Sequence, residues 1–140
     1  MLTVYIVDDS EMMRERLTES ISDLAGIQVT GQSGDPYEAY NAIQKSHPDA
    51  VVLDIRLPGR SGIDLLKDIK KNPQAPVVIM VTNFPYRQYR EGCMRAGADY
   101  FFSKINQFEM IAETLQRIAG QRRPAGNPKT QATNRGNDFS

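Results

Sequence analysis

Residues 50–59 read AVVLDIRLPG: four apolar residues lead into Asp54, and Pro58-Gly59 then interrupts the chain. An apolar run without alternation is typical of a strand that is buried on both faces, as in a parallel sheet. Pro-Gly is a turn signal, so the strand ends close to Asp54. We therefore expect Asp54 at the carboxyl end of a central strand, where open α/β sheets bind their ligands.

Four further strands are predicted around this one. Residues 2–7 form an apolar run that ends at Asp8-Asp9, and residues 77–81 form another that ends at Thr82. Residues 27–31 alternate and belong nearer an edge, while residues 100–102 form a short last strand before Ser103-Lys104. The strands alternate with five helical patterns, which predicts an α/β fold with helices on both faces of a parallel sheet. We predict a doubly wound five-stranded sheet in the order 2-1-3-4-5.

Each predicted helix has a start signal of its own. These signals are a cap at Ser10, a cap at Asp35 followed by Pro36, a cap at Ser61, a first residue at Pro85, which begins a helix through Ala96, and an Asn106/Glu109 capping box.

The composition limits the function classes. The chain has 140 residues, 40% of them apolar and 24% charged, with a formal net charge of zero, which does not favour a nucleic-acid partner. Its one cysteine, Cys93, excludes an internal disulfide framework. No apolar stretch approaches the ~20 residues that span a bilayer, so a cytoplasmic location is expected. We predict one domain over residues 1–120 and a flexible, basic tail over residues 121–140.

Polar side chains gather where the predicted strands end: Asp8, Asp9, Asp54, Thr82 and Lys104. Two carboxylates at ~4 Å repel by about 4 kcal/mol at an effective dielectric near 20, so a proton or a cation must be present. Oxygen ligands with open positions favour Mg²⁺, with Mn²⁺ as a substitute. A carboxylate, a metal and a lysine together indicate an aspartyl-phosphate site with Asp54 as the nucleophile.

Four segments resemble the receiver domain of two-component response regulators. They are Val-Asp-Asp-Ser at 7–10, Leu-Asp-Ile-Arg-Leu-Pro-Gly at 53–59, Val-Thr-Asn at 81–83 and Ala-Gly-Ala-Asp-Tyr-Phe-Phe-Ser-Lys at 96–104. The resemblance covers about residues 1–120 and implies a flavodoxin-like three-layer sandwich.

The resemblance also implies roles for the rim residues. Asp54 would accept the phosphoryl group, and Asp9, Asp54 and the backbone carbonyl of Arg56 would bind Mg²⁺, with Asp8 acting mostly through water. By the same resemblance Thr82 would be the switch hydroxyl, Phe101 the aromatic that follows it, and Lys104 the phosphate-sensing lysine.

The chain departs from the family pattern at several positions. Ile105 replaces the usual proline after Lys104, and Asn83 replaces a small residue after Thr82. Arg56 and Phe84 would flank the hydrolytic water, and we hypothesise that Phe84 obstructs it. A partner face is expected around the fourth helix, at Tyr86, Arg87, Tyr89, Arg90 and Arg95.

The leading hypothesis is a stand-alone response regulator of bacterial signalling, switched by phosphorylation from a histidine kinase or phosphotransfer protein. It would catalyse only its own phosphorylation and dephosphorylation, and would signal to a protein target as a monomer or a phosphorylation-dependent dimer. The alternatives are a phosphohydrolase acting on an external substrate and a receiver-shaped adaptor that is not phosphorylated. A DNA-binding regulator is disfavoured because no helix-turn-helix segment follows residue 120.

Overall fold

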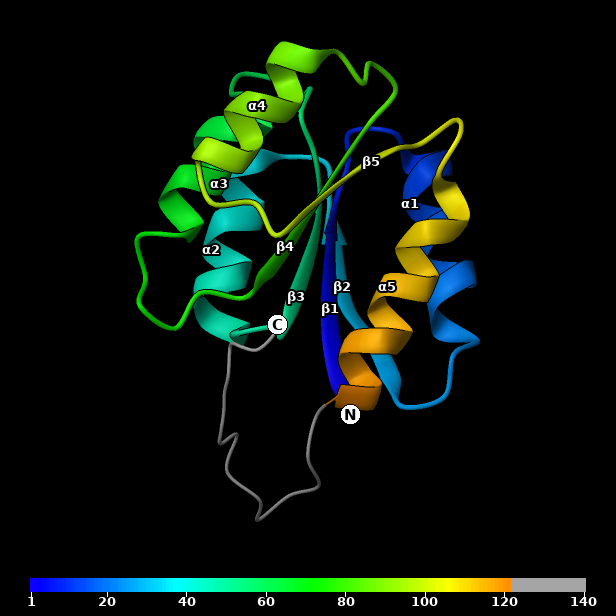
Figure 1. Ribbon diagram of the computed structural model, residues 1–140. Coiled ribbons are helices and arrows are strands. Elements are labelled where there is room, and N and C mark those ends of the chain that lie inside the picture. Colours follow the sequence, from blue (N-terminus) through cyan, green and yellow to red (C-terminus); the bar gives the residue numbers. More distant parts are fainter. Residues whose placement is uncertain (122–140) are drawn as a thin grey trace.

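A five-stranded parallel sheet runs through the computed structural model, which describes residues 1–121 (Figure 1). The spatial order is β2-β1-β3-β4-β5, which confirms the predicted order and the α/β class. The strands are β1 (Leu2–Val7), β2 (Ile27–Ser33), β3 (Ala50–Asp54), β4 (Val77–Thr82) and β5 (Tyr100–Ser103).

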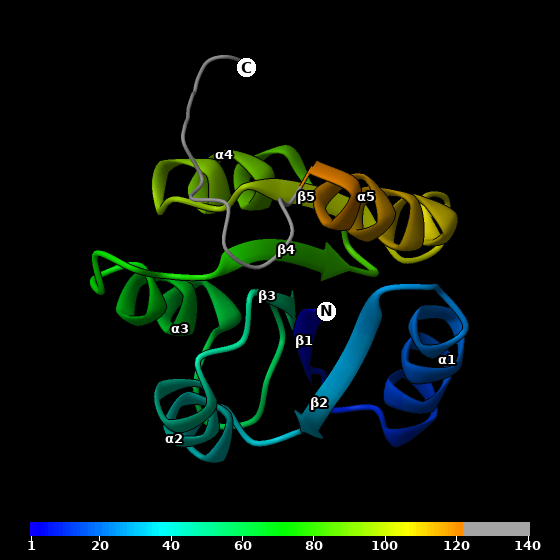
Figure 2. The same ribbon diagram turned by 90° about the horizontal axis from the view of Figure 1, so that it is seen from below.

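Five helices cover the two faces of the sheet (Figures 1 and 2). Helices α1 (Glu11–Ser22) and α5 (Phe108–Gln121) lie on one face. Helices α2 (Pro36–Ser46), α3 (Gly62–Ile69) and α4 (Arg87–Arg95) lie on the other. The molecule is therefore the three-layer sandwich that the alternation of strands and helices predicted.

The central strand β3 contributes to both hydrophobic cores because successive strand residues point to opposite faces. Val51 and Leu53 pack in the core under α2, α3 and α4, whereas Ala50 and Val52 pack in the core under α1 and α5. All four are fully buried. Burying one such Val or Leu side chain contributes about 1.5–3 kcal/mol, so β3 anchors the fold from the middle of the sheet.

The helix caps agree with the sequence pattern at three of five starts. The side-chain oxygens of Ser10, Asp35 and Ser61 accept hydrogen bonds from the backbone N–H groups of the first turn of α1, α2 and α3. Helix α4 begins at Arg87 rather than Pro85, because the residue before it, Tyr86, has an extended backbone (φ −68°, ψ 147°).

The start of α5 also differs from the expectation, since the helix begins at Phe108. The turn before it is closed by Ser103, whose hydroxyl accepts from the N–H groups of Ile105 and Asn106. The Ser103 N–H in turn donates to the side-chain carbonyl of Gln107 at 3.0 Å. These bonds replace the Asn106/Glu109 capping box that the sequence pattern suggested.

Two expectations concern the termini and membranes. The predicted tail, residues 121–140, lies outside the described residues except for Gln121, which is the last residue of α5. The division of the chain near residue 120 therefore stays a prediction. Over residues 1–121, none of the helices combines the length and apolarity that crossing a bilayer requires.

Candidate functional site

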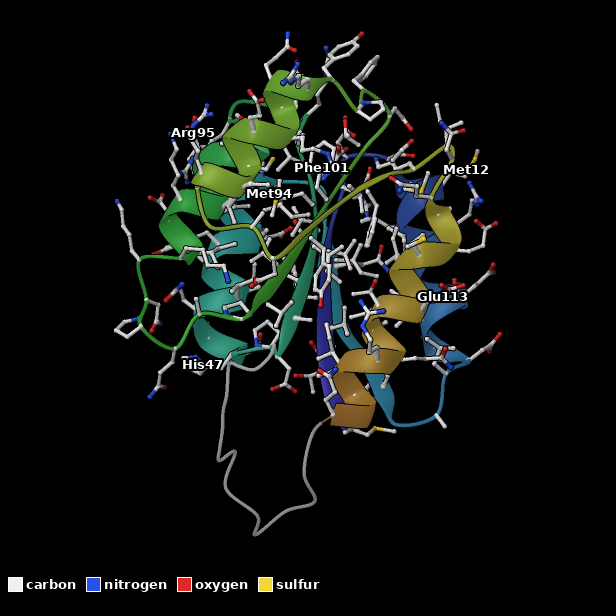
Figure 3. The ribbon with its side chains drawn as sticks, viewed as in Figure 1. Met12, His47, Met94, Arg95, Phe101 and Glu113 are labelled. Carbon is white, nitrogen blue, oxygen red and sulfur yellow. The ribbon has the colours of Figure 1, made fainter. Side chains whose placement is uncertain are left out.

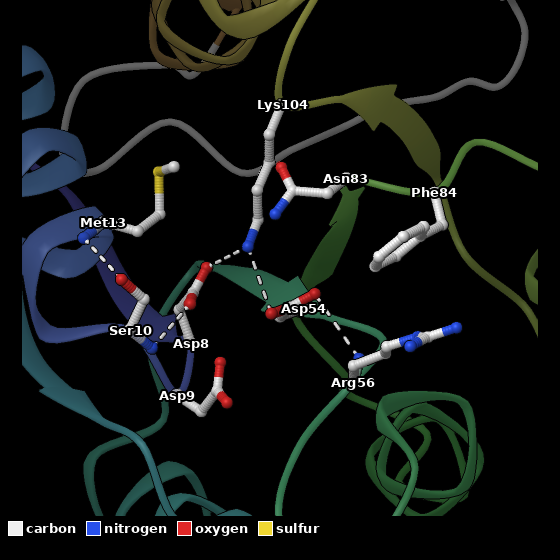
Figure 4. Close-up of a pocket in the computed structure, with 9 residues that line it drawn as sticks. All are labelled: Asp8, Asp9, Ser10, Met13, Asp54, Arg56, Asn83, Phe84 and Lys104. Atoms are coloured by element: carbon white, nitrogen blue, oxygen red, sulfur yellow. Dashed lines mark hydrogen bonds and ion pairs between the residues drawn. The ribbon is translucent and has the colours of Figure 1, made fainter.

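The carboxyl edge of the sheet brings together side chains that lie up to about a hundred residues apart in the sequence. Asp8 follows β1, Asp54 ends β3, Thr82 ends β4 and Lys104 follows β5. Because the four strands are adjacent and parallel, their carboxyl ends meet at one edge. Asp8, Asp54 and Lys104 line one pocket of about 230 Å³ there, as the sequence predicted (Figure 4).

The Lys104 ammonium group lies between two carboxylates. Its Nζ is 2.5 Å from Asp8 Oδ2 and 3.1 Å from Asp54 Oδ2 (Figure 4). All three residues are buried, with exposed fractions of 6% for Lys104, 0% for Asp8 and 6% for Asp54. Because water is largely excluded, these charges interact more strongly than the same groups would on the surface. One lysine thus forms ion pairs with two buried acids.

A third carboxylate completes the acidic cluster. Asp9 is exposed, and the carboxylate oxygens of Asp8, Asp9 and Asp54 lie within 4.8 Å of one another. Within the described residues, Asp8 Oδ2 has no hydrogen-bond donor aligned with it and relies on its ion pair with Lys104. An all-oxygen cluster with an unsatisfied buried lone pair fits a hard divalent cation such as Mg²⁺.

The pKa of Asp54 is raised above its ordinary value, chiefly because burial disfavours the charged carboxylate. Lys104 acts in the opposite direction, and the nearby charge of Asp8 raises the pKa further. The Arg56 N–H donates to Asp54 Oδ1 at 3.4 Å and lowers the pKa slightly. Lys104 therefore does not fully offset the effect of burial on the pKa of Asp54.

Gly62 allows helix α3 to start directly against the end of β3. Its N–H donates to the Ile55 carbonyl at 2.6 Å, and a Cβ at this position would lie 1.9 Å from the Asp54 carbonyl oxygen. Any larger residue would push α3 away from the strand that carries Asp54. The glycine thus positions the backbone of the predicted phosphoacceptor.

Thr82 and Phe101 lie near the pocket but do not line it. The Thr82 hydroxyl is buried and accepts the Phe84 N–H at 2.9 Å, so its own hydrogen is free to be donated elsewhere. Phe101 is 4% exposed and packs in the core under α4, with the Arg90 guanidinium 5.0 Å from the centre of its ring (Figure 3). Phe101 thus lies under α4, and the Thr82 hydroxyl bonds to the loop that leads from β4 to α4.

Arg56 and Phe84, which the sequence predicted beside the site, contact each other in the structure. Arg56 and Phe84 both line the pocket, and the Arg56 guanidinium carbon lies 4.1 Å from the centre of the Phe84 ring (Figure 4). Three other lining residues, Ser10, Met13 and Asn83, were not predicted as part of the site. Ser10 directly follows Asp9 and Asn83 directly follows Thr82, so their positions in the sequence could have predicted that they line the pocket. Met13 lies one helical turn beyond Ser10, so only the docking of α1 reveals it.

The predicted partner residues lie on or beside α4, away from the pocket. Tyr86 precedes the helix and packs against Tyr89, with ring centres 5.5 Å apart. Arg87 pairs with Glu91 at 3.1 Å, and Arg95 lies on the last turn (Figure 3). None of these side chains lines the acidic pocket. Their binding role stays a prediction.

Ile105, at the position where proline was expected by resemblance, is 71% exposed. All peptide bonds of the described residues are trans, including the one between Lys104 and Ile105. The chain therefore passes from β5 to α5 without the turn that a cis proline would make.

Comparison with known proteins identifies the class of protein that this fold and site define. Residues 4–116 match the model of the response regulator receiver domain. A response regulatory protein of Vibrio cholerae is 33% identical over 94% of this chain and 54% of its own length. A protein-glutamate methylesterase/protein-glutamine glutaminase of Caulobacter vibrioides is 32% identical over 99% of this chain and 43% of its own length.

The fold comparison agrees. The response regulator domain of Thermotoga maritima CheB superposes with a TM-score of 0.75 at 30% identity, covering 86% of this chain and 95% of that one. The chain belongs to the response regulator receiver domain family of two-component systems. It spans about half the length of the curated relatives that it matches.

Proposed function

We propose that this chain acts as a response regulator receiver that accepts a phosphoryl group on Asp54 from a phosphohistidine of a histidine kinase or phosphotransfer protein. The observation that supports it best is the Asp8–Lys104–Asp54 arrangement inside an acidic pocket. A cytoplasmic location, where such donors carry their phosphohistidine, belongs to the same proposal. The downstream partner would bind around α4.

The transfer requires one carboxylate oxygen of Asp54 to attack phosphorus in line while the phosphorus–nitrogen bond of the donor breaks. The phosphoryl group moves to Asp54 as an acyl phosphate, and the donor leaves as histidine. Lys104, 3.1 Å from Asp54 Oδ2, would hold a phosphoryl oxygen. Asp54 must be deprotonated to attack, and Lys104 favours that charged form.

The acidic cluster supplies ligands for Mg²⁺ or Mn²⁺. We propose that Asp9, Asp54 and the Arg56 carbonyl would bind the ion directly and that Asp8 would act mostly through water. The bound ion would neutralise charge on the phosphoryl oxygens and on the carboxylates around them. The 4.8 Å grouping of the three acids supports this assignment.

The switch would run through Thr82 and Phe101. Thr82 has a hydroxyl hydrogen to donate to a phosphoryl oxygen on Asp54. Its movement would change the packing space beside Phe101, which already lies in the core under α4. A local charge change would in this way bias the α4-β5-α5 face between two states.

Intact mass spectrometry after incubation with acetyl phosphate tests the proposal. Wild type is expected to gain one phosphoryl group only with Mg²⁺, and Asp54→Asn is expected to gain none. The absence of labelling in wild type would contradict the proposal and favour the adaptor alternative. Release of phosphate from external esters at many turnovers would favour the phosphohydrolase.

We also propose that Phe84 shields the acyl phosphate from water, since its ring lies at the pocket wall. Phe84→Ala is expected to raise the first-order rate of phosphate loss about tenfold, measured on purified phosphoprotein. Phe108→Ala is the matched control, because Phe108 also carries an arginine on its ring but lies outside the pocket. An unchanged rate in Phe84→Ala would show that Phe84 does not shield the phosphorus.

A further inference from the structure

Arg56 combines a tethered backbone with a guanidinium group that is held only weakly. Its N–H donates to Asp54 Oδ1, so the Arg56 backbone is held beside the predicted phosphoacceptor. Its side chain then runs along the pocket wall and rests on the Phe84 ring, 4.1 Å from the ring centre (Figure 4). Across residues 1–121, the guanidinium has no carboxylate partner. Its donors are thus free for another acceptor.

The contact of the Arg56 guanidinium with the Phe84 ring is weaker than the contact it could make with a phosphoryl group on Asp54. A cation–π contact at an exposed site stabilises much less than charge-assisted bidentate hydrogen bonds to a phosphoryl group. The fork of an arginine matches two phosphoryl oxygens, which a ring face cannot imitate. Arg56 itself is exposed, so little packing would be lost when its side chain turns.

The charge of the pocket also calls for a second basic group. Asp8 and Asp9 carry two negative charges, and a phosphoryl group on Asp54 would bring close to two more. A divalent cation and Lys104 together supply three positive charges. One net negative charge remains, and Arg56 is the basic residue besides Lys104 among those that line the pocket.

We infer that Arg56 is a phosphoryl-binding residue: its guanidinium leaves the Phe84 ring when Asp54 is phosphorylated and binds the phosphoryl oxygens. In the unphosphorylated state the Phe84 ring holds the guanidinium by the cation–π contact. The inference rests on the proposed phosphorylation of Asp54. It assigns to the Arg56 side chain a role separate from that of its backbone carbonyl.

Nuclear magnetic resonance of arginine Nε–Hε groups tests the inference directly. A proton above an aromatic ring resonates upfield, so the Arg56 signal, assigned by its loss in Arg56→Gln, should lie upfield in the free protein. Adding beryllofluoride and Mg²⁺, which together stand in for the phosphoryl group and its ion, should move it downfield. Arg16 is the internal control, because its guanidinium lies 4.4 Å from the Phe108 ring and outside the pocket.

Binding of beryllofluoride with Mg²⁺, measured by titration, gives the second readout. Arg56→Gln is expected to weaken binding about tenfold and Arg56→Lys by less, while Arg16→Gln binds as wild type does. Phe84→Leu frees the guanidinium and is expected to tighten binding two- to threefold. Circular dichroism confirms that each variant is folded.

The outcomes separate this inference from the proposed function. If wild type neither binds beryllofluoride nor is labelled by acetyl phosphate, the proposed function fails and the inference with it. If wild type does both, but the Arg56 signal stays upfield or Arg56→Gln binds equally well, the inference alone is wrong. Weaker binding by Phe84→Leu would likewise overturn it, since a contact made only in the unphosphorylated state cannot strengthen the bound state.

Discussion

The two edges of the sheet carry aspartates in opposite conditions. At the amino edge, Asp49 accepts from the Thr3 N–H at 2.8 Å and from the Thr3 hydroxyl at 3.0 Å. Asp99 accepts from the Val78 N–H and from Lys70, both at 2.8 Å. Each acid there joins neighbouring strands and has donors for its charge. These contacts stabilise the sheet.

At the carboxyl edge, among the described residues, three acids lie around a single paired basic group. Asp8, Asp9 and Asp54 lie together, and Lys104 is shared between two of them. Burial raises the pKa of Asp54, which means that the fold disfavours its charge. The same residue type therefore stabilises the fold at one edge and holds a poorly compensated charge at the other. The difference shows that the carboxyl edge suits a ligand that brings positive charge, which the proposed function requires.

The largest expected effect comes from removing the shared lysine. Lys104→Met would leave two buried carboxylates without a cation and should lower the free energy of unfolding by about 3 kcal/mol. Urea denaturation without divalent cations measures it. Mg²⁺ should restore part of the loss, because it supplies the missing positive charge.

Lys70→Met at the amino edge is the matched control. The Lys70 and Asp99 side chains are 21% and 39% exposed, so this pair is worth about 1 kcal/mol or less, and Mg²⁺ should not change the effect of its loss. Equal losses in the two variants would mean that the two edges do not differ as described.

A smaller effect of opposite sign is expected for Asp54→Asn. The pKa of Asp54 is raised above 3.8 in the folded protein, so its favourable contribution is complete below pH 3.8 and is lost as the pH rises through the folded pKa. At neutral pH without metal, Asp54→Asn should therefore unfold at a higher temperature than wild type, and the gain should vanish near pH 3. Thermal scans across this pH range test the sign. A variant that is less stable at neutral pH would show that Lys104 more than compensates the burial of Asp54.

The smallest effect concerns Cys93, a buried group whose pKa is shifted by burial alone. Cys93 in α4 is fully buried, and burial raises the pKa of its thiol to about 11. Iodoacetamide at pH 8 should therefore leave Cys93 unlabelled in the folded protein and label it in urea. Rapid labelling without denaturant would mean that α4 opens readily. Cys93 then serves as a reference for burial alone, against which the charged neighbours of Asp54 are judged.

The strands and the site residues on them were predictable because each follows from a local pattern. The apolar run before Asp54, like the one before Asp8, ends in acid, and parallel strands bring such ends to one edge. Helix starts were predictable where a side chain caps its own backbone, as at Ser10 and Ser61. The start of α4 was not, because Tyr86 has no capping group and only its extended backbone delays the helix.

By itself, the sequence determined which residues reach the carboxyl edge, since apolar periodicity and chain breaks are local properties. Only the tertiary structure decided how they meet: that Lys104 bridges Asp8 and Asp54, that Met13 lines the pocket, and that Arg56 rests on Phe84. These contacts join residues that are 28 to 96 positions apart, except for Met13, which α1 brings in from one turn away. Their geometry depends on how strands and helices pack, and no local pattern encodes it.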